Sequence, residues 1–385
     1  MSVKQSSRLV FFCNGFQFNI TGAVKRAILS DQAFSQHRLI SIATPLFKHE
    51  PKEVQIEFMN YPTTRDIHKF KHYPSPPFSY FLDVFWVLFL VRAHIIISFS
   101  PHITFFALIL KRLGLVKYVV HWSIDFSPRR FKNFLFELIY RFFDRESFLQ
   151  SSLHVDVSQP ALRARCQIYG KHISIDVNNK LVVPVGIPEN ALEQIPSSNF
   201  LIKKIFFLGN LTDTVGIDTF VKVCEQVHTQ GIEATFHVIG DGPEFEKSKA
   251  MAIKLGVDYK FTWYGNLSKE EFEPILKTAT IGLAPYKNVV SSFSIYADPS
   301  KIKNYAQFGI PFVMTNIPKV STEFVSNNFG VILDDDLEKL TIATLKLLTN
   351  ERHWKNQSNL VFAYAQTMIW ESVLKEFMES LKALK

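Results

Sequence analysis

The stretch ADPSKIKNYAQFGIPFVMT, residues 297–315, predicts a short helix that runs directly into a buried strand. Asp298 suits the N-cap position of this helix, because its carboxylate can accept hydrogen bonds from the first backbone N–H groups. Gly309 lies just past the expected end of the helix, where glycine is strongly favoured. The apolar run that follows, PFVMT, is typical of a strand that is covered on both faces.

Lys301 and Asn304 lie three positions apart in this helix, so their side chains share one face. A cation beside an amide suits a phosphate group with neighbouring hydroxyl groups. A helix face that is simply solvated would show the same pair, so the pattern alone leaves both interpretations open.

Outward from this stretch, short apolar runs alternate with helical segments at regular spacing. The runs are KIFFLG, ATFHVIG, FTWYG, TIGLAPY, PFVMT and GVILDD. This alternation predicts a parallel sheet with helices on both faces. The segments RLVFFCNG, HRLISIAT, VQIEFMNY, AHIIISFS, KYVVHWSI, LHVDVSQ and KLVVPVG predict a second, less regular α/β unit in the first half.

Ligands in such sheets bind outside the carboxyl ends of the strands, so the residues just after each strand are the candidates. Glycine at these turns lets a ligand approach backbone N–H groups, although a simple tight turn explains the same residues. In the second half the candidates for binding are Gly209, Asn210, Gly240, Asp241, Gly242, Pro243, Ser300 and Asn304. In the first half they are Asn14, Gly15, His121 and Asp125.

Composition and charge limit the classes of function. The chain has 385 residues, is 47% hydrophobic and has three widely spaced cysteines, which predicts a globular protein without a disulfide framework or zinc site. Residues 1–200 carry 23 Lys and Arg against 14 Asp and Glu, whereas residues 201–385 carry 20 against 21. The basic excess of the first half suits an anionic membrane or a phosphorylated acceptor, or is only a solvated surface.

The most apolar segment, residues 78–99, is interrupted by Asp83 and Arg92. It predicts a buried helix followed by a buried strand and not a membrane span, which needs about 20 apolar residues. Residues 184–200 are rich in Pro, Ser and Asn and predict a linker. One long amphipathic helix is predicted to end the chain.

The segments VIGDGPE, TWYGNLSKEEFEPILKTATIGLAPY and DPSKIKNYAQFGIPFVMTN resemble the C-terminal half of family 4 glycosyltransferases. The segment HWSIDFSPRRFKNFLFELIYRFFDRESF is similar to one found in bacterial surface-polysaccharide members. The resemblance implies an α/β GT-B fold, in which two Rossmann-like domains have parallel sheets facing across a cleft. It implies domains over 1–185 and 186–355, with the helix at 356–385 packing back on the first.

The resemblance also implies site residues and a reaction. The C-terminal domain would hold a nucleoside diphosphate sugar, and transfer would retain the anomeric configuration without a metal or other cofactor. His121, Asp125, Asp298 and Lys301 are the residues expected to carry catalysis.

The chain departs from the family at several positions. Asn304 stands where a ribose-binding glutamate is usual. Tyr296 falls at a second glutamate and Val215 at a phosphate-binding lysine. The half after residue 200 has a single arginine, Arg352.

The predicted function is therefore sugar transfer from a nucleoside diphosphate sugar to a lipid-linked or oligosaccharide acceptor in cell-surface polysaccharide biosynthesis. A catalytically silent subunit that binds another transferase, or a sugar-nucleotide epimerase of the same fold, are the alternatives that the departures leave open. The expected location is cytoplasmic, with peripheral contact to an anionic membrane at the inner face of the cell membrane. Nucleic acid is not an expected partner, because no recognised binding motif accompanies the basic excess.

Overall fold

The computed structural model describes residues 8–14, 19–45, 52–60, 64–74, 78–89, 93–170, 177–289 and 293–384. The chain divides into two compact units. The first unit comprises Met1–Pro184 with Val373–Lys385, and the second comprises Val185–Ser372.

Among the described residues, eight strands form the sheet of the first unit in the order β4-β3-β2-β1-β5-β6-β7-β8. They are β1 (Arg8–Asn14), β2 (Arg38–Thr44), β3 (Glu53–Asn60), β4 (Thr64–Lys71), β5 (Ala93–Ser98), β6 (Tyr118–Ser123), β7 (Leu153–Asp156) and β8 (Lys180–Val182). Strand β3 pairs antiparallel with both β2 and β4, and the other pairs are parallel. Strand β4 was not expected, because polar and charged residues fill most of its positions.

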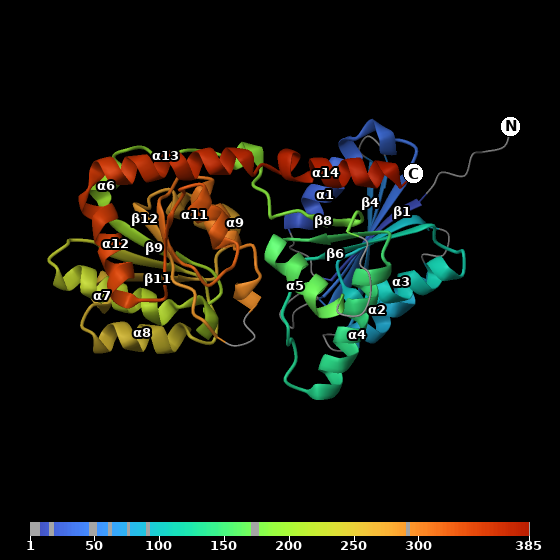
Figure 1. The fold of residues 1–385 in the computed structure, drawn as a ribbon, viewed down its shortest axis with the longest axis horizontal. Helices are drawn as coiled ribbons and strands as arrows, with labels where there is room; N and C mark the ends of the chain where they lie inside the picture. The colour runs from blue at the N-terminus through green and yellow to red at the C-terminus, as the bar shows by residue number, and fades with distance from the viewer. Residues whose placement is uncertain are drawn as a thin grey trace. The chain divides into compact units, whose positions relative to one another are not determined.

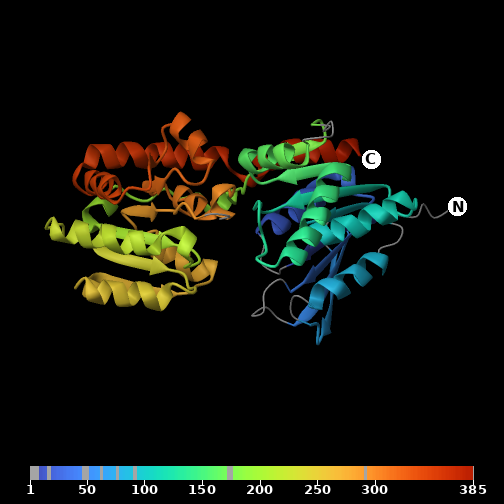
Figure 2. The ribbon, with the colours of Figure 1, turned by 60° about the horizontal axis from the view of Figure 1, so that its bottom comes forward.

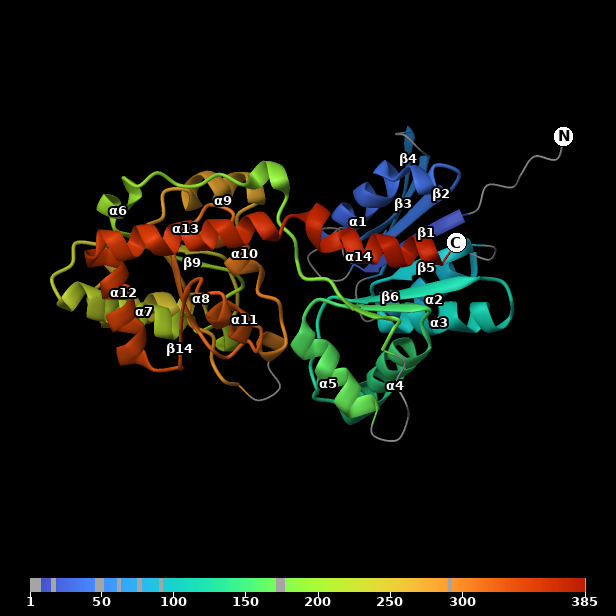
Figure 3. The ribbon, with the colours of Figure 1, turned by 45° about the horizontal axis from the view of Figure 1, so that its top comes forward.

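Helices cover both faces of this sheet, as Figure 1 shows. They are α1 (Asn19–Ser30), α2 (Phe78–Phe89), α3 (Pro101–Arg112), α4 (Phe134–Gln150), α5 (Gln159–Tyr169) and α14 (Trp370–Ala383). Figure 3 shows α14 running beside α1 on the face opposite α2 to α5. On that face α14 packs Phe377 against Trp122 of β6, with ring centroids 4.8 Å apart.

The segment at 78–99 is a helix followed by a strand, which confirms the predicted elements. The expectation that its helix is buried is wrong for one side, because Phe78, Leu82 and Phe85 of α2 are exposed. No helix among the described residues has both the length and the apolar character needed to cross a bilayer.

The described strands of the second unit form one parallel sheet in the order β11-β10-β9-β12-β13-β14. They are β9 (Lys204–Leu208), β10 (Thr235–Ile239), β11 (Phe261–Gly265), β12 (Ile281–Ala284), β13 (Phe312–Thr315) and β14 (Val331–Leu333). The fully parallel pairing agrees with the continuous apolar runs in the sequence.

Helices also cover both faces of the second sheet (Figure 2). They are α6 (Asn199–Ile202), α7 (Ile217–Thr229), α8 (Phe245–Lys254), α9 (Lys269–Leu276), α10 (Ser300–Ala306), α11 (Ser321–Ser326), α12 (Leu337–Thr349) and α13 (Glu351–Thr367). Helix α12 packs against α7 on one face, and α13 packs against α10 on the other. Helix α9 begins with a capping box between Ser268 and Glu271.

Two expectations about the connections need correction. The predicted linker is anchored along the second unit, where the N–H groups of Glu193 and Ile195 donate to backbone carbonyls at positions 307 and 308. The single C-terminal helix is two helices, α13 and α14. The chain leaves the helical path near Ile369, because Ile187 forms a β-bridge there and its N–H donates to Met368 at 2.7 Å.

Candidate functional site

Backbone hydrogen bonds join the carboxyl end of β10 to the ends of its two neighbours, β9 and β11. The N–H of Gly209 donates to Ile239 O at 3.0 Å, and the N–H of Gly240 donates to Gly265 O at 2.8 Å. These two N–H groups therefore already have carbonyl partners, and donor binding at Gly209 and Gly240 stays a prediction.

The glycines of the β10 turn are required by this loop packing. A Cβ at Gly240, which has φ +138°, would lie 1.9 Å from Gly209 O. One at Gly242, which has φ +154°, would lie 2.5 Å from Leu211 O. Neighbouring backbone thus leaves no room for a side chain at either glycine. Asp241 and Pro243 are exposed on the same turn, and the Asp241 carboxylate accepts from the Gly242 N–H at 2.7 Å.

Lys301 lies at the same edge, in the first turn of α10. Its side chain is buried, and its Nζ makes no hydrogen bond with any described residue. The Nζ lies 4.3 Å from the ring centroid of Phe207 and 4.6 Å from that of Tyr286. A Cβ at Gly209 would meet Lys301 Cε at 3.4 Å and Nζ at 3.6 Å, so the glycine leaves room for this side chain.

Burial lowers the pKa of Lys301 to about 7, from an ordinary value of 10.5. Two aromatic faces favour the cation, but they do not replace the hydrogen bonds that an ammonium makes in water. An anion placed beside Nζ would supply these bonds and restore the charge. The arrangement can therefore hold a phosphate oxygen at the end of β9.

The other predicted residues of this edge are less enclosed. Asn304 is half-buried on α10, and its amide makes no hydrogen bond with the described part of the chain. Ser300 is exposed at the start of the helix, and Asn210 is exposed just after β9. All three side chains can therefore reach a ligand without breaking a contact of the fold.

Asp298 lies inside the unit, in a cluster with Lys303 and Tyr364. Its Oδ2 accepts from the Val185 N–H at 2.7 Å, and its Oδ1 is 3.5 Å from Lys303 Nζ. Lys303 Nζ also donates to the Tyr364 hydroxyl. Burial lowers the pKa of Lys303, but the Asp298 charge and the Tyr364 contact outweigh it and hold this pKa above its ordinary value.

Because its carboxylate is engaged in this way, Asp298 does not cap α10. The helix begins at Ser300, with Pro299 in the N-cap position and no side-chain cap. The cluster fastens α10 to the start of the second unit and to α13. The sequence gives little sign of this role, since Lys303 and Tyr364 are 61 residues apart.

In the first unit His121 is fully buried inside β6, two positions before the strand ends. Its Nδ1 lies 2.8 Å from Thr104 Oγ1, and its Nε2 has no partner among the described residues. Burial, with a smaller contribution from His154, lowers the pKa of His121 well below its ordinary value. The ring is therefore neutral and enclosed in the sheet.

Asp125 follows the end of β6 and is partly exposed. Its carboxylate accepts a hydrogen bond from Arg130 Nη1 at 2.7 Å. Beneath it, the wholly buried Arg165 donates to Asp144, to Asp156 and to Ser123. Sequence analysis missed this buried network, which holds the ends of β6 and β7 against α4 and α5. The charged Asp156 within an apolar strand is the signal that could have pointed to it.

Two predicted residues of the first unit lie at the end of β1. Gly15 lies outside the described residues, and only the backbone of Asn14 is described.

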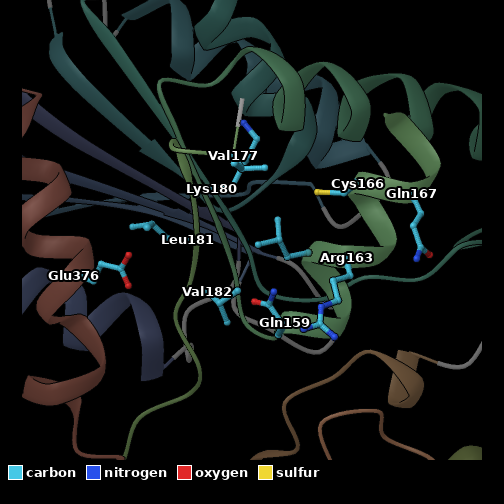
Figure 4. A pocket seen from close by; sticks show the side chains of 10 residues that line it. Gln159, Arg163, Cys166, Gln167, Val177, Lys180, Leu181, Val182 and Glu376 are labelled. Carbon is cyan, nitrogen blue, oxygen red and sulfur yellow. The ribbon is translucent and has the colours of Figure 1, made fainter. Parts of the chain in front are cut away.

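A groove of about 530 Å³ lies elsewhere in this unit, along the edge strand β8 (Figure 4). Arg163 and Cys166 of α5, Lys180 of β8 and Glu376 of α14 line it. It contains none of the predicted site residues. No metal-binding group of His, Cys, Asp and Glu occurs in the described ranges, which leaves the expected absence of a metal a prediction.

Comparison with known proteins identifies the architecture. Residues 202–350 match the family Glycosyl transferases group 1. No curated protein matches the chain. Among solved structures, sucrose-phosphate synthase from Thermosynechococcus elongatus aligns over 98% of this chain and 99% of its own, with a TM-score of 0.73 and 11% identity.

Two further structures have the same fold. WaaG, a glycosyltransferase involved in lipopolysaccharide biosynthesis, aligns over 97% of this chain and 98% of its own, with a TM-score of 0.65 and 16% identity. HepE from Anabaena, in complex with UDP-glucose, aligns over 98% and 99%, with a TM-score of 0.69 and 13% identity. Residues 202–350 therefore form a glycosyl transferases group 1 domain, and the chain as a whole has the GT-B fold.

Proposed function

We propose that this protein transfers a sugar from a nucleoside diphosphate sugar to a lipid-linked or oligosaccharide acceptor in cell-surface polysaccharide biosynthesis, with retention of the anomeric configuration. The observation that carries the proposal is the buried ammonium of Lys301, which has no hydrogen-bond partner among the described residues and lies at the carboxyl edge of the sheet in the group 1 domain. Retention and the acceptor class follow from the resemblance of the sequence to family 4 enzymes.

In this mechanism the second unit holds the donor by its diphosphate. The bond between the anomeric carbon and the diphosphate oxygen breaks, and its electron pair remains on the departing diphosphate. Lys301 stabilises that growing negative charge at short range, in surroundings where burial strengthens the interaction. The acceptor hydroxyl forms the new bond to the anomeric carbon, and its proton passes to the departing diphosphate oxygen.

The remaining donor contacts are assigned to the exposed polar side chains of the same edge. Asn304 would hold the ribose hydroxyls through its amide, and Ser300 and Asn210 would bind the sugar or the phosphates. These contacts are weaker than those of a carboxylate or a guanidinium, because they lack charge. We therefore expect Lys301 to contribute most of the affinity for the diphosphate.

In the first unit, the partly exposed Asp125 is the proposed contact to the acceptor or to the transferred sugar. Its carboxylate is oriented by Arg130 at the end of β6. His121 is enclosed in the sheet and would act only by positioning the Ser123 end of β6. Asp298 would likewise act by positioning α10, and with it Lys301.

A panel of UDP-, GDP-, ADP- and dTDP-sugars tests the proposal in two measurements. At a concentration about 100 times its Kd, a true donor should raise the melting temperature by about 5 °C. The same donor should be hydrolysed slowly without an acceptor. Binding without any turnover would contradict the transfer reaction, and the absence of both effects for every donor would contradict donor binding itself.

A further inference from the structure

A second lysine follows the carboxyl end of β12, the strand that pairs with β9. Lys287 stands three positions after this strand, and its side chain is 35% exposed. The residue before it is Tyr286, whose ring centroid lies 4.6 Å from the Nζ of Lys301. The two lysines therefore approach one edge of the sheet from different loops, and Lys301 is enclosed whereas Lys287 is open to solvent.

Backbone contacts fix the place from which Lys287 extends. Its N–H donates to the carbonyl of Thr214 at 3.0 Å, which joins the loop after β12 to the turn before α7. Gly216 allows this contact, because a Cβ there would lie 1.7 Å from Pro285 O. Helix α7 then begins at Ile217 without a side-chain cap, and the free N–H groups at the start of a helix favour an anion. Lys287 thus extends from a fixed backbone beside the start of α7.

In the free protein the ammonium of Lys287 is paired with Asp218 in the first turn of α7. Its Nζ donates to Asp218 Oδ2 at 2.7 Å, and the Asp218 side chain is 24% exposed. Burial raises the pKa of Asp218, but the hydrogen bond and the charge of Lys287 outweigh this effect and hold the pKa below its ordinary value. Breaking an ion pair this exposed costs about fivefold or less in an equilibrium constant. Lys287 can therefore exchange Asp218 for a ligand that carries more negative charge.

Lys301 alone does not match the charge of a diphosphate, because each of the two phosphates is negatively charged and a single ammonium offsets only one of them. Lys303 of the same helix is already paired with Asp298 at 3.5 Å. On the open side of the edge, Lys287 and the uncapped start of α7 offer a cation and backbone N–H groups to the second phosphate. A single phosphate, by contrast, can bind Lys301 while Lys287 stays paired with Asp218.

We propose that Lys287 binds the second phosphate of the donor, and that Asp218 makes the site select diphosphates over monophosphates. The inference rests on the proposed function, because it concerns the donor of that reaction. A ligand with two phosphates draws Lys287 away from Asp218 and gains a charge-assisted contact. A ligand with one phosphate leaves the ion pair intact and gains no such contact. The donor is therefore a nucleoside diphosphate sugar and not a nucleoside monophosphate sugar.

Calorimetric titration of the full chain with inorganic pyrophosphate and with inorganic phosphate tests the assignment without a nucleobase. The wild type should bind pyrophosphate about tenfold more tightly than phosphate. Lys287→Met should weaken pyrophosphate binding by about tenfold and phosphate binding much less, because it removes a cation and leaves the Asp218 carboxylate beside the second phosphate. Asp218→Asn should strengthen pyrophosphate binding by about threefold to fivefold, because Lys287 then has no competing carboxylate.

Opposite shifts in the two variants are a result that a purely structural ion pair would not give. If the pair only joined the loop after β12 to α7, both variants would loosen the edge and weaken binding, and this outcome overturns the proposal. It is also overturned if Lys287→Met binds pyrophosphate like the wild type, or if the wild type binds no pyrophosphate. The matched control is the ion pair of Lys260 with Glu233, 2.6 Å long, which precedes β11 and β10 at the opposite edge of the sheet. Lys260→Met and Glu233→Gln should leave the affinity for pyrophosphate unchanged.

The thermal-shift panel of nucleotide sugars separates this proposal from the proposed function. A nucleotide sugar should raise the melting temperature of the wild type more than that of Lys287→Met. Equal shifts in the two proteins would support donor binding and contradict the role of Lys287. The absence of a shift in the wild type for every nucleotide sugar would contradict both.

Discussion

Lys301 combines two properties that rarely coexist without a ligand. It is buried between two aromatic rings, and its ammonium has no hydrogen-bond partner among the described residues. The free-energy cost of removing the ammonium from water exceeds the stabilisation that the two aromatic rings provide, and the pKa of Lys301 therefore falls to about 7. The free protein therefore keeps a destabilised cation at the position where an anion would stabilise it.

This lysine predicts a particular pH dependence of donor binding. A bound diphosphate raises the pKa of Lys301 above the value of about 7 in the free protein, so the complex holds more protons above that pH. Donor affinity should therefore be constant below about pH 7 and fall by up to tenfold per pH unit above it. Calorimetric titrations between about pH 6 and 8.5 measure the slope. The same slope in Lys301→Met would contradict the assignment.

Asn304 offers a second prediction at the residue scale. Asn304→Glu restores a carboxylate at the expected ribose position, and a charge-assisted hydrogen bond is about 1 kcal/mol stronger than a neutral one. The Kd of the donor should therefore fall by about fivefold. Asn356→Glu adds the same charge on the exposed side of α13 and serves as the control. Equal affinities of wild type and Asn304→Glu would place Asn304 outside the donor site.

At the scale of elements, a buried cluster of polar side chains holds α10 in position. Asp298 accepts from Val185 and pairs with Lys303, which in turn contacts Tyr364 of α13. The position of Lys301 is therefore set by three segments that are distant in sequence. Loss of this pair should disturb both stability and donor binding.

Asp298→Asn keeps an acceptor for the Val185 N–H but leaves the Lys303 ammonium without its buried counter-charge. The free energy of unfolding should decrease by about 3 to 5 kcal/mol, measured by urea denaturation. Asp335→Asn, which removes an exposed carboxylate, should change it by less than about 0.5 kcal/mol. Similar stabilities of the two variants would show that the Asp298–Lys303 pair does not fasten α10.

The sequence predicted the elements better than the contacts between them. The alternation of apolar strands and helices was enough to predict the parallel sheet of the second unit, whereas the shared face of Lys301 and Asn304 stays a prediction. The roles of Gly240 and Gly242 were not predictable, because a glycine that admits a ligand and one that admits a neighbouring loop look alike. Asp298 was misassigned for a related reason, since its partner Val185 lies 113 residues away.

At the scale of the whole molecule, each unit has its own hydrophobic core. The last helix closes the core of the first unit although it follows the second in sequence. The orientation of α4 could not be predicted either. Only the structure shows that the charged Glu137 is buried while its apolar neighbours on the helix are exposed.

The contact between α14 and β6 predicts a local effect of Phe377→Ala. This substitution leaves a cavity beside Trp122 and should destabilise the first unit by about 3 to 5 kcal/mol. Hydrogen exchange should show faster exchange in α1 and β6 with no change in β9 to β14. Faster exchange throughout both units would mean that the chain unfolds as one cooperative body.

The central claim is that the ammonium of Lys301 binds the diphosphate of the donor, and calorimetric titration of Lys301→Met at pH 7 with the donor found in the panel tests it most directly. Methionine fills the same space without a buried charge, so the free variant should be about 1 to 3 kcal/mol more stable than the wild type. Its donor affinity should nevertheless be at least about tenfold weaker. Wild-type affinity in this more stable variant would contradict the account, because Lys301 would then be a packing residue and not the diphosphate ligand.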